Sequence, residues 1–287
     1  MSLTEGIRAK AGELLESGVV ECVIGYERGT DGVNARPAFV YSTDEVDRLI
    51  FDDTCSHNLV KYLLNRKGKT TAVVAKPCDA RGVNLLLNEH QIEREKVHVI
   101  GVVCPGVVDS AWGSKGDKLR AVCEVCRQHV PPVYDHLVGD VPASEPEVPE
   151  PYADIEKMEG MSVAERAAFW EAEFSRCIRC YACRQACPGC YCVECFVERL
   201  HPLWVGIRIG PGENQMWNAM RAFHLAGRCI GCNQCEKVCP VNIPLSLLNR
   251  KLEKEAWELF HFRAGMAPDT AAPFATFEKD EKVGIGE

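Results

Sequence analysis

Long apolar runs and a basic excess are both missing from this chain of 287 residues. No stretch of eighteen apolar residues occurs, so we expect no transmembrane segment. The first ten residues, MSLTEGIRAK, lack the basic region and apolar stretch of a secretory signal. The formal net charge is -8, which argues against a nucleic-acid partner because nucleic-acid binders carry a basic face. These absences favour a cytoplasmic location.

The usual catalytic and nucleotide-binding motifs are also absent. The sequence contains no Walker motif, no G-x-S-x-G and no H-E-x-x-H. Gly210-Pro-Gly212 lacks the strand-turn-helix context of a dinucleotide-binding loop. No acid-base pair or nucleophile stands out, so we name no catalytic residue and expect a non-catalytic role.

Cysteine, by contrast, is abundant, with 17 residues. In a reducing compartment, cysteines in such number are more often metal ligands than disulfide partners. Cys22 lies inside an apolar strand pattern and is interpreted as a buried structural thiol. The other sixteen cysteines are candidate ligands, enough for up to four four-cysteine sites.

The first half of the chain predicts an α/β domain over residues 1–140 with a partly parallel sheet. Helical periodicity covers residues 2–17, and strand patterns cover 18–29 and 35–42, with a helix expected to begin near Asp53. Apolar β-branched runs then end at Cys78 and Cys104, separated by a helical pattern with Asp79 as its expected N-cap. Strand, helix and strand in this order form a βαβ unit, which requires parallel strands.

The second half predicts a mainly helical domain over residues 158–262. A Pro/Glu-rich linker over 141–157 precedes it, and an extended tail over 263–287 follows it. Ser162 and Glu165 form a capping-box pattern that opens one helix, and apolar periodicity predicts a last helix over about 245–260. We expect the tail residues Phe274 and Phe277 to be ordered by a partner.

Two copies of one cysteine pattern, C-x2-C-x2-C-x3-C-P, lie in this second half. The pattern is the bacterial two-cluster ferredoxin signature, in which the fourth cysteine of each copy serves the other cluster. Structural zinc is the alternative, but zinc sites rarely use this spacing twice. We therefore predict two [4Fe-4S] clusters, one held by the first ferredoxin set (Cys177, Cys180, Cys183, Cys239) and one by the second ferredoxin set (Cys229, Cys232, Cys235, Cys187).

A third site is predicted in the α/β domain. Cys78 and Cys104 both end strands of the βαβ unit, so they emerge at the same carboxyl edge of the sheet, where open α/β sheets place their sites. Cys123 and Cys126 follow soon afterwards and can fold over that edge. We call Cys78, Cys104, Cys123 and Cys126 the third cysteine set and predict a third cluster there. Zinc, with His129 as a further ligand, or no metal at all, remain alternatives.

A fourth site is predicted from the remaining cysteines. Cys190, Cys192 and Cys195 directly follow the first ferredoxin copy and need one more ligand, for which Cys55 is the unassigned cysteine. Zinc with nearby His201 is the rival, and Cys55 could exchange roles with Cys78. Five basic residues flank the ferredoxin cysteines and either tune a cluster, dock a partner or are simply solvated: Arg176, Arg179, Arg184, Arg228 and Lys237. Tyr181 and Tyr191 are interpreted as packing residues.

The sequence also resembles known families. CIRCYACRQACPGCYCVECFV and AFHLAGRCIGCNQCEKVCP are similar to the dicluster ferredoxin modules of formate dehydrogenase beta subunits and of heterodisulfide-reductase-associated subunits. DDTCSHNLVKYL, VAKPCDARGVNLLL and VIGVVCPGVVD resemble the beta subunits of deazaflavin-dependent hydrogenases and formate dehydrogenases, and more loosely those of sulfhydrogenases. Together these segments cover most of residues 45–260. Several such relatives bind a flavin and a soluble hydride carrier, so the resemblance keeps FAD as an alternative cofactor.

Two functions follow from the cysteines and the resemblance. The favoured one is an iron-sulfur subunit that relays single electrons in an anaerobic oxidoreductase complex. The implied partners are a formate dehydrogenase or hydrogenase catalytic subunit, or a heterodisulfide-reductase-like flavoprotein. The alternative is a flavin-bearing subunit that oxidises or reduces a deazaflavin, a nicotinamide or a ferredoxin. A zinc-stabilised interaction module would fit only without iron.

Overall fold

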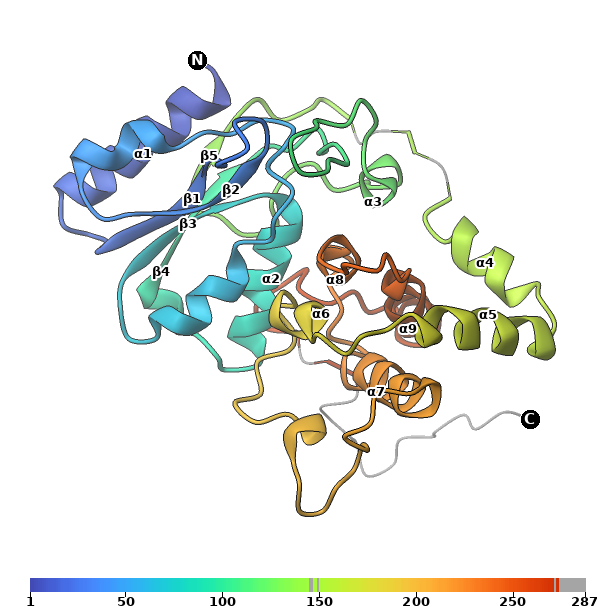
Figure 1. Ribbon diagram of the computed structural model, residues 1–287. Coiled ribbons are helices and arrows are strands. Elements are labelled where there is room, and N and C mark those ends of the chain that lie inside the picture. The colour runs from blue at the N-terminus through green and yellow to red at the C-terminus, as the bar shows by residue number, and fades with distance from the viewer. Residues whose placement is uncertain (145–146, 149, 271, 274–287) are drawn as a thin grey trace.

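A five-stranded sheet forms the centre of the N-terminal half in the computed structural model, which describes residues 1–144, 147–148, 150–270 and 272–273 (Figure 1). Its strand order is β2-β1-β3-β4-β5, and only the β1–β2 pair is antiparallel. The partly parallel sheet predicted from the sequence is therefore confirmed. The strands are β1 (Cys22–Arg28), β2 (Ala35–Val40), β3 (Thr71–Ala75), β4 (Val97–Val102) and β5 (His136–Val138).

The βαβ unit consists of β3, helix α2 (Pro77–Asn88) and β4. Every residue of β3 is buried, as expected for a central parallel strand. The expected N-cap is wrong: Lys76 caps the helix and Asp79 is its third residue. The helix starts early because Pro77 has a fixed φ suited to a first helical position. Asp79 instead accepts a hydrogen bond from the Lys76 main-chain N–H at 3.1 Å.

The helix expected from about Asp53 is a 3-10 helix that begins only at Val60 (η2, Val60–Arg66). Asp52 accounts for the delay, because its side chain accepts a hydrogen bond from the main-chain N–H of Thr54 at 2.8 Å and stabilises a turn. The predicted N-terminal helix is present as α1 (Leu3–Glu16), which buries Ile7, Ala11 and Leu14. The remaining 3-10 helices are η1 (Thr43–Arg48), η3 (Arg94–Lys96) and η4 (Phe196–Glu198).

The C-terminal half is helical, in agreement with the predicted fold class. Ser162 and Glu165 form the predicted capping box of α5, and α9 occupies the predicted range. A helix, α4, covers the end of the segment expected to be a linker, and its Asp154 pairs with Arg250 of α9. The helices are α3 (Ala121–Glu124), α4 (Ala153–Glu159), α5 (Val163–Ser175), α6 (Ala182–Gln185), α7 (Pro211–His224), α8 (Gln234–Lys237) and α9 (Leu245–Phe260).

The two halves pack against each other, with α2 between the sheet and the C-terminal helices (Figure 1). The Arg81 Nε–H donates to the carbonyl oxygen of Ala264 at 2.9 Å, and Asn84 Nδ2 donates to that of Gly265 at 3.0 Å. The start of the expected tail is therefore bound to α2, while Phe274 and Phe277 lie outside the described residues. In the part of the chain that the structure describes, no helix has the length and apolarity needed to span a membrane.

Candidate metal centres

The two ferredoxin loops repeat each other in backbone conformation as well as in sequence. Arg179 and Gly231 precede the second cysteine of their loops with φ of 51° and 66°. Tyr181 and Asn233 follow that cysteine with φ of 58° and 49°. Each is the N-cap of a four-residue helix, Tyr181 of α6 and Asn233 of α8. These left-handed residues turn the chain tightly on both sides of the second cysteine in each loop.

The first ferredoxin set gathers around one apolar cluster. Cys177, Cys183 and Cys239 pack together against Phe174 and Ile243, although 62 positions separate Cys177 from Cys239. Burial raises the pKa of the Cys183 thiol to about 11, and the charges of Cys177 and Cys180 add to this. The fourth cysteine of the second copy therefore lies with Cys177 and Cys183 of the first copy, in a cluster that also includes Cys235 of the second ferredoxin set.

The second ferredoxin set shows the reciprocal arrangement. All four of its cysteines line one small cavity, together with Gly189 and Leu225. Burial raises the pKa of the Cys229, Cys232 and Cys235 thiols. The pKa of Cys187 is lowered, first by a hydrogen bond from the Cys190 thiol. Cys187 thus leaves its own loop and reaches the second one.

Three buried polar side chains that we did not single out from the sequence contact these cysteines. Asn218 Nδ2 lies 3.9 Å from the Cys177 sulfur, and Asn249 Nδ2 lies 3.5 Å from the Cys235 sulfur. Arg221 donates to the carbonyl oxygen of Cys183 at 3.0 Å, and its charge acts on thiols of both ferredoxin sets. A sequence signal existed, since Asn214, Asn218 and Arg221 occupy one face of α7 and are all buried.

The third cysteine set lines a cavity of about 740 Å³ at the carboxyl edge of the sheet, which we call the sheet-edge cavity. Cys78 and Cys104 follow neighbouring parallel strands, as the βαβ argument predicts. Cys123 on α3 and Cys126 just after it complete the wall. Cys232 of the second ferredoxin set lines the same cavity, and the charge of Cys78 contributes, after burial and the charge of Cys187, to raising the pKa of its thiol.

The wall of the sheet-edge cavity is rich in positive charge. Burial raises the pKa of the Cys104 thiol to about 11, and the nearby Lys76 ammonium opposes that effect. A cluster bound by four thiolates is negatively charged, so cationic neighbours fit its electrostatic needs. Five arginines line the cavity: Arg81, Arg120, Arg127, Arg250 and Arg263.

The donor chemistry of the three cysteine sets fits cubane clusters, because each set offers four thiols, and those of the second ferredoxin set and of the third cysteine set each line one cavity. Within the described residues, no three His, Cys, Asp or Glu side chains converge closely enough to hold a single metal ion. A tetrahedral zinc with Zn–S bonds of about 2.3 Å draws its ligand sulfurs to about 4 Å from one another. A cubane spaces them more widely, because each cysteine binds a different iron. His129 is the further ligand that the zinc alternative would use, and its Nε2 lies 3.2 Å from the carbonyl oxygen of Cys126.

The four cysteines of the predicted fourth site lie in different surroundings. The Cys190 thiol contacts Cys187, Cys192 is exposed, and Cys195 packs near Trp217. Cys55 is buried in the N-terminal core, where burial raises its pKa to about 12 and Asp52 donates its main-chain N–H to the sulfur at 3.4 Å. These contacts give no support to Cys55 as the missing ligand.

The remaining predicted residues have structural partners. Cys22 is fully buried, as expected, and Tyr181 packs edge-on against Trp217 with ring centroids 5.2 Å apart. Tyr191 contacts Glu89 through its hydroxyl. Each of the five basic residues that flank the ferredoxin cysteines makes a polar contact. The pairs are Arg176 with Glu173, Arg179 with Gly206, Arg184 with Glu198, Arg228 with Glu89, and Lys237 with Ser110.

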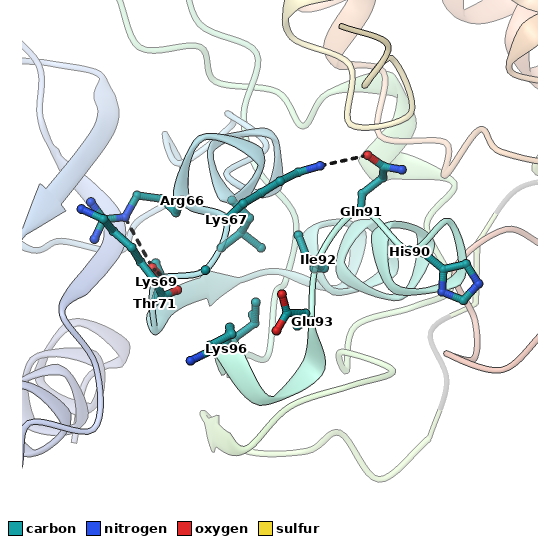
Figure 2. Close-up of a pocket in the computed structure, with 12 residues that line it drawn as sticks. Arg66, Lys67, Lys69, Thr71, His90, Gln91, Ile92, Glu93 and Lys96 are labelled. Carbon is teal, nitrogen blue, oxygen red and sulfur yellow. Dashed lines mark hydrogen bonds between the residues drawn. The ribbon is translucent and has the colours of Figure 1, made fainter.

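A second cavity, of about 160 Å³, lies at the opposite, amino edge of β3 and β4 (Figure 2). Lys67 Nζ donates to Gln91 Oε1 at 3.2 Å there, and Arg66 Nε lies 3.4 Å from the Thr71 hydroxyl. No cysteine is among its twelve lining residues. The third cysteine set therefore lies at the carboxyl edge of the sheet, and this second cavity has no cysteine in its lining.

Comparison with known proteins agrees with this geometry. The family model of the 4Fe-4S dicluster domain matches residues 176–244. This chain contains a 4Fe-4S dicluster domain. That domain includes both ferredoxin loops and all eight cysteines of the two ferredoxin sets.

Relatives extend the similarity into the sheet half. The F420-dependent formate dehydrogenase subunit beta of Methanocaldococcus jannaschii is 24% identical, over 84% of this chain and 86% of the relative. The F420-dependent formate dehydrogenase 1 subunit beta of Methanococcus maripaludis is 23% identical, over 91% of this chain and 89% of the relative. The predicted resemblance to formate dehydrogenase beta subunits is confirmed, and together with the dicluster domain it supports an iron-sulfur electron-transfer subunit.

Proposed function

We propose that this chain relays single electrons through three [4Fe-4S] clusters, held by the two ferredoxin sets and the third cysteine set. The observation that carries the proposal is the shared position of Cys78 and Cys232, which line the same cavity from the two halves of the molecule. Bound cubanes supply one-electron transfer, with potentials set by charge and hydrogen bonding. The chain's own residues hold these sites close together and surround them with positive charge.

The contacts between the sites give the order in which electrons would pass through the relay. The second ferredoxin set adjoins the third cysteine set through Cys232, and it adjoins the first ferredoxin set through Cys183 and Cys235. Cys180 of the first set is exposed. We therefore propose that one partner exchanges electrons at the sheet-edge cavity and another near Cys180.

The partners are proposed from the relatives, which are named as subunits of F420-dependent formate dehydrogenases. A catalytic redox subunit of the formate dehydrogenase or hydrogenase type, or a heterodisulfide-reductase-like flavoprotein, would deliver or receive the electrons. We propose no acid-base or nucleophilic chemistry for this chain itself.

The test is a reductive titration of the purified, iron-loaded chain under anaerobic conditions. The chain should take up about three electrons from a strong chemical reductant, one for each cubane. It should show no turnover with formate, hydrogen or a pyridine nucleotide alone. Uptake of only two electrons would remove the third cysteine set from the relay.

One observation favours a second function, that of a flavin-bearing subunit. The sheet-edge cavity of about 740 Å³ is within the size range of ligand pockets, and Tyr152 and Trp257 add aromatic surface beside its arginines. A flavin with its phosphates would suit such a wall. Stoichiometric flavin in the purified chain, together with turnover of a deazaflavin or nicotinamide, would favour this function over the relay.

A further inference from the structure

Two buried side-chain amides in the wall of the sheet-edge cavity have no hydrogen-bond acceptor. They are the NH2 groups of Asn58 and Gln234, whose side chains come from the sheet half and from α8 respectively. Both residues line the cavity, and they are only 5% and 3% exposed. Leaving a buried donor unpaired costs about 1–3 kcal/mol, so an acceptor is expected in the space they face.

The orientation of both amides is fixed by their oxygen atoms. The main-chain N–H of Asn58 donates to Gln234 Oε1 at 2.9 Å, and that of Val60 donates to Asn58 Oδ1 at 3.1 Å. Rotating either amide by 180° would replace an acceptor with a donor and break one of these bonds. The two NH2 groups are therefore the side-chain atoms left to face the sheet-edge cavity, and Gln234 also lines the small cavity of the second ferredoxin set, so the second ferredoxin signal is followed alongside the third.

The ferredoxin half shows what such an amide contacts in this protein. Asn218 Nδ2 is 3.9 Å from the Cys177 sulfur of the first ferredoxin set, and Asn249 Nδ2 is 3.5 Å from the Cys235 sulfur of the second. Each ferredoxin set thus has a buried asparagine that donates to sulfur. The cavity that Asn58 and Gln234 line contains the four thiols of the third cysteine set.

We infer that Asn58 and Gln234 donate hydrogen bonds to the sulfur atoms of a cluster held by the third cysteine set, and that they raise its reduction potential. This inference rests on the proposed function. Reduction adds negative charge to the cluster, and donors to sulfur stabilise the more negative state. Because Asn58 and Gln234 belong to different halves and the Asn58 main-chain N–H donates to Gln234 Oε1, the pair also links the third site to the ferredoxin half.

The experiment is a redox titration of the iron-loaded full chain, followed by electron paramagnetic resonance, in wild type and variants. Gln234→Met and Asn58→Leu remove one donor each, from different halves of the molecule. Each should favour the oxidised third cluster about tenfold, which for one electron corresponds to a potential about 59 mV lower. The first ferredoxin signal should not move. Gln234→Met keeps the inference testable if Asn58→Leu, which loses the bond from Val60, does not fold.

Two further variants serve as controls. Asn249→Leu should lower the potential of the second ferredoxin signal and leave the third signal unchanged. Asn84→Leu removes a buried amide of α2 that donates to Gly265, so it should move no potential. An unchanged third signal in both donor variants would overturn the inference and leave the relay intact. A wild type with only two cubane signals would overturn the third site of the relay and the inference together.

Discussion

Lys76 and Asp79 form an ion pair in the interior, with Nζ 2.7 Å from Oδ2 and both side chains almost fully buried. Lys76 Nζ also donates to the carbonyl oxygen of His57 at 2.8 Å, and Asp79 Oδ1 accepts from the Leu59 main-chain N–H at 2.9 Å. Burial acts to lower the pKa of Lys76, but the Asp79 charge raises it well above its ordinary value. The pair therefore binds the segment 57–59 to the start of α2, next to Cys78.

Breaking this pair should destabilise the protein strongly. Asp79→Ala leaves the Lys76 ammonium buried without its counter-charge, and such changes cost about 3–5 kcal/mol. We expect a loss of that size in the free energy of unfolding, measured by anaerobic urea denaturation of the iron-loaded chain.

An exposed ion pair provides the control for that experiment. Arg48→Ala breaks the contacts of Arg48 with Glu27 and Glu45 at the surface, where pairs contribute about 0–1 kcal/mol. The double variant Lys76→Met, Asp79→Leu should recover much of the loss, because it removes both buried charges. Equal losses in Asp79→Ala and Arg48→Ala would contradict the assigned role.

His57 should make the stability of the protein depend on pH. Its pKa is lowered from 6.5 to about 4, first by burial and then by the positive charges of Lys76, Lys237 and Arg120. Between pH 6.5 and 4 the unfolded chain binds this proton and the folded one does not, so stability falls as pH falls through that window. Above pH 6.5 the contribution is complete.

The variant His57→Gln isolates this effect. The free energy of unfolding of wild type should drop by up to about 1.4 kcal/mol more per pH unit than that of the variant between pH 6 and 5. The difference between the two proteins should stay constant from pH 7 to 8. Parallel curves at all these pH values would show that His57 is not held neutral.

Sequence patterns predicted the fold where local rules act alone. The continuous apolar runs before Cys78 and Cys104 identified the parallel strands, and Ser162 with Glu165 identified the start of α5. The start of α2 was missed because Asp79 suits an N-cap and a third helical position equally well, and Pro77 decided between them. The turn at Asp52 depends on a side-chain hydrogen bond that periodicity does not reveal.

For the candidate site, the sequence predicts a set of ligands but not the residues that surround them. Spacing alone grouped Cys187 with the second ferredoxin loop, because that signature has a known geometry. Asn58 and Gln234 are 176 positions apart, and only tertiary packing brings them together. Cys55 stays a predicted ligand of the fourth site, and its burial beside Asp52 is likewise a result of tertiary packing that the sequence pattern does not reveal.

Crossed ligation predicts which cysteine variants resemble each other. Cys239→Ser should damage the same cluster signal as Cys177→Ser, because both thiols belong to the first ferredoxin set. Cys229→Ser should damage the other signal, and Cys22→Ser, which alters a buried thiol of the sheet, should damage neither. Paramagnetic resonance of the reduced variants makes the comparison. If Cys239→Ser matched Cys229→Ser instead, each loop would hold its own cluster.

The iron content tests how many sites the chain holds. Three cubanes require about twelve irons per chain, and a fourth would require about sixteen. We expect about twelve irons, because the four thiols of the third cysteine set line one cavity. For the fourth site, the contacts of Cys55 include none of Cys190, Cys192 and Cys195.

Two matched variants sharpen that count. Cys78→Ser removes a proposed ligand at the sheet edge and should reduce the iron content to about eight. Cys55→Ser alters a thiol that contacts Asp52 and should leave about twelve. Anaerobic purification followed by iron and zinc analysis gives both numbers. About sixteen irons in wild type, falling by about four in Cys55→Ser, would instead establish the fourth site with Cys55 as its ligand, because only a ligand's loss removes a whole cubane.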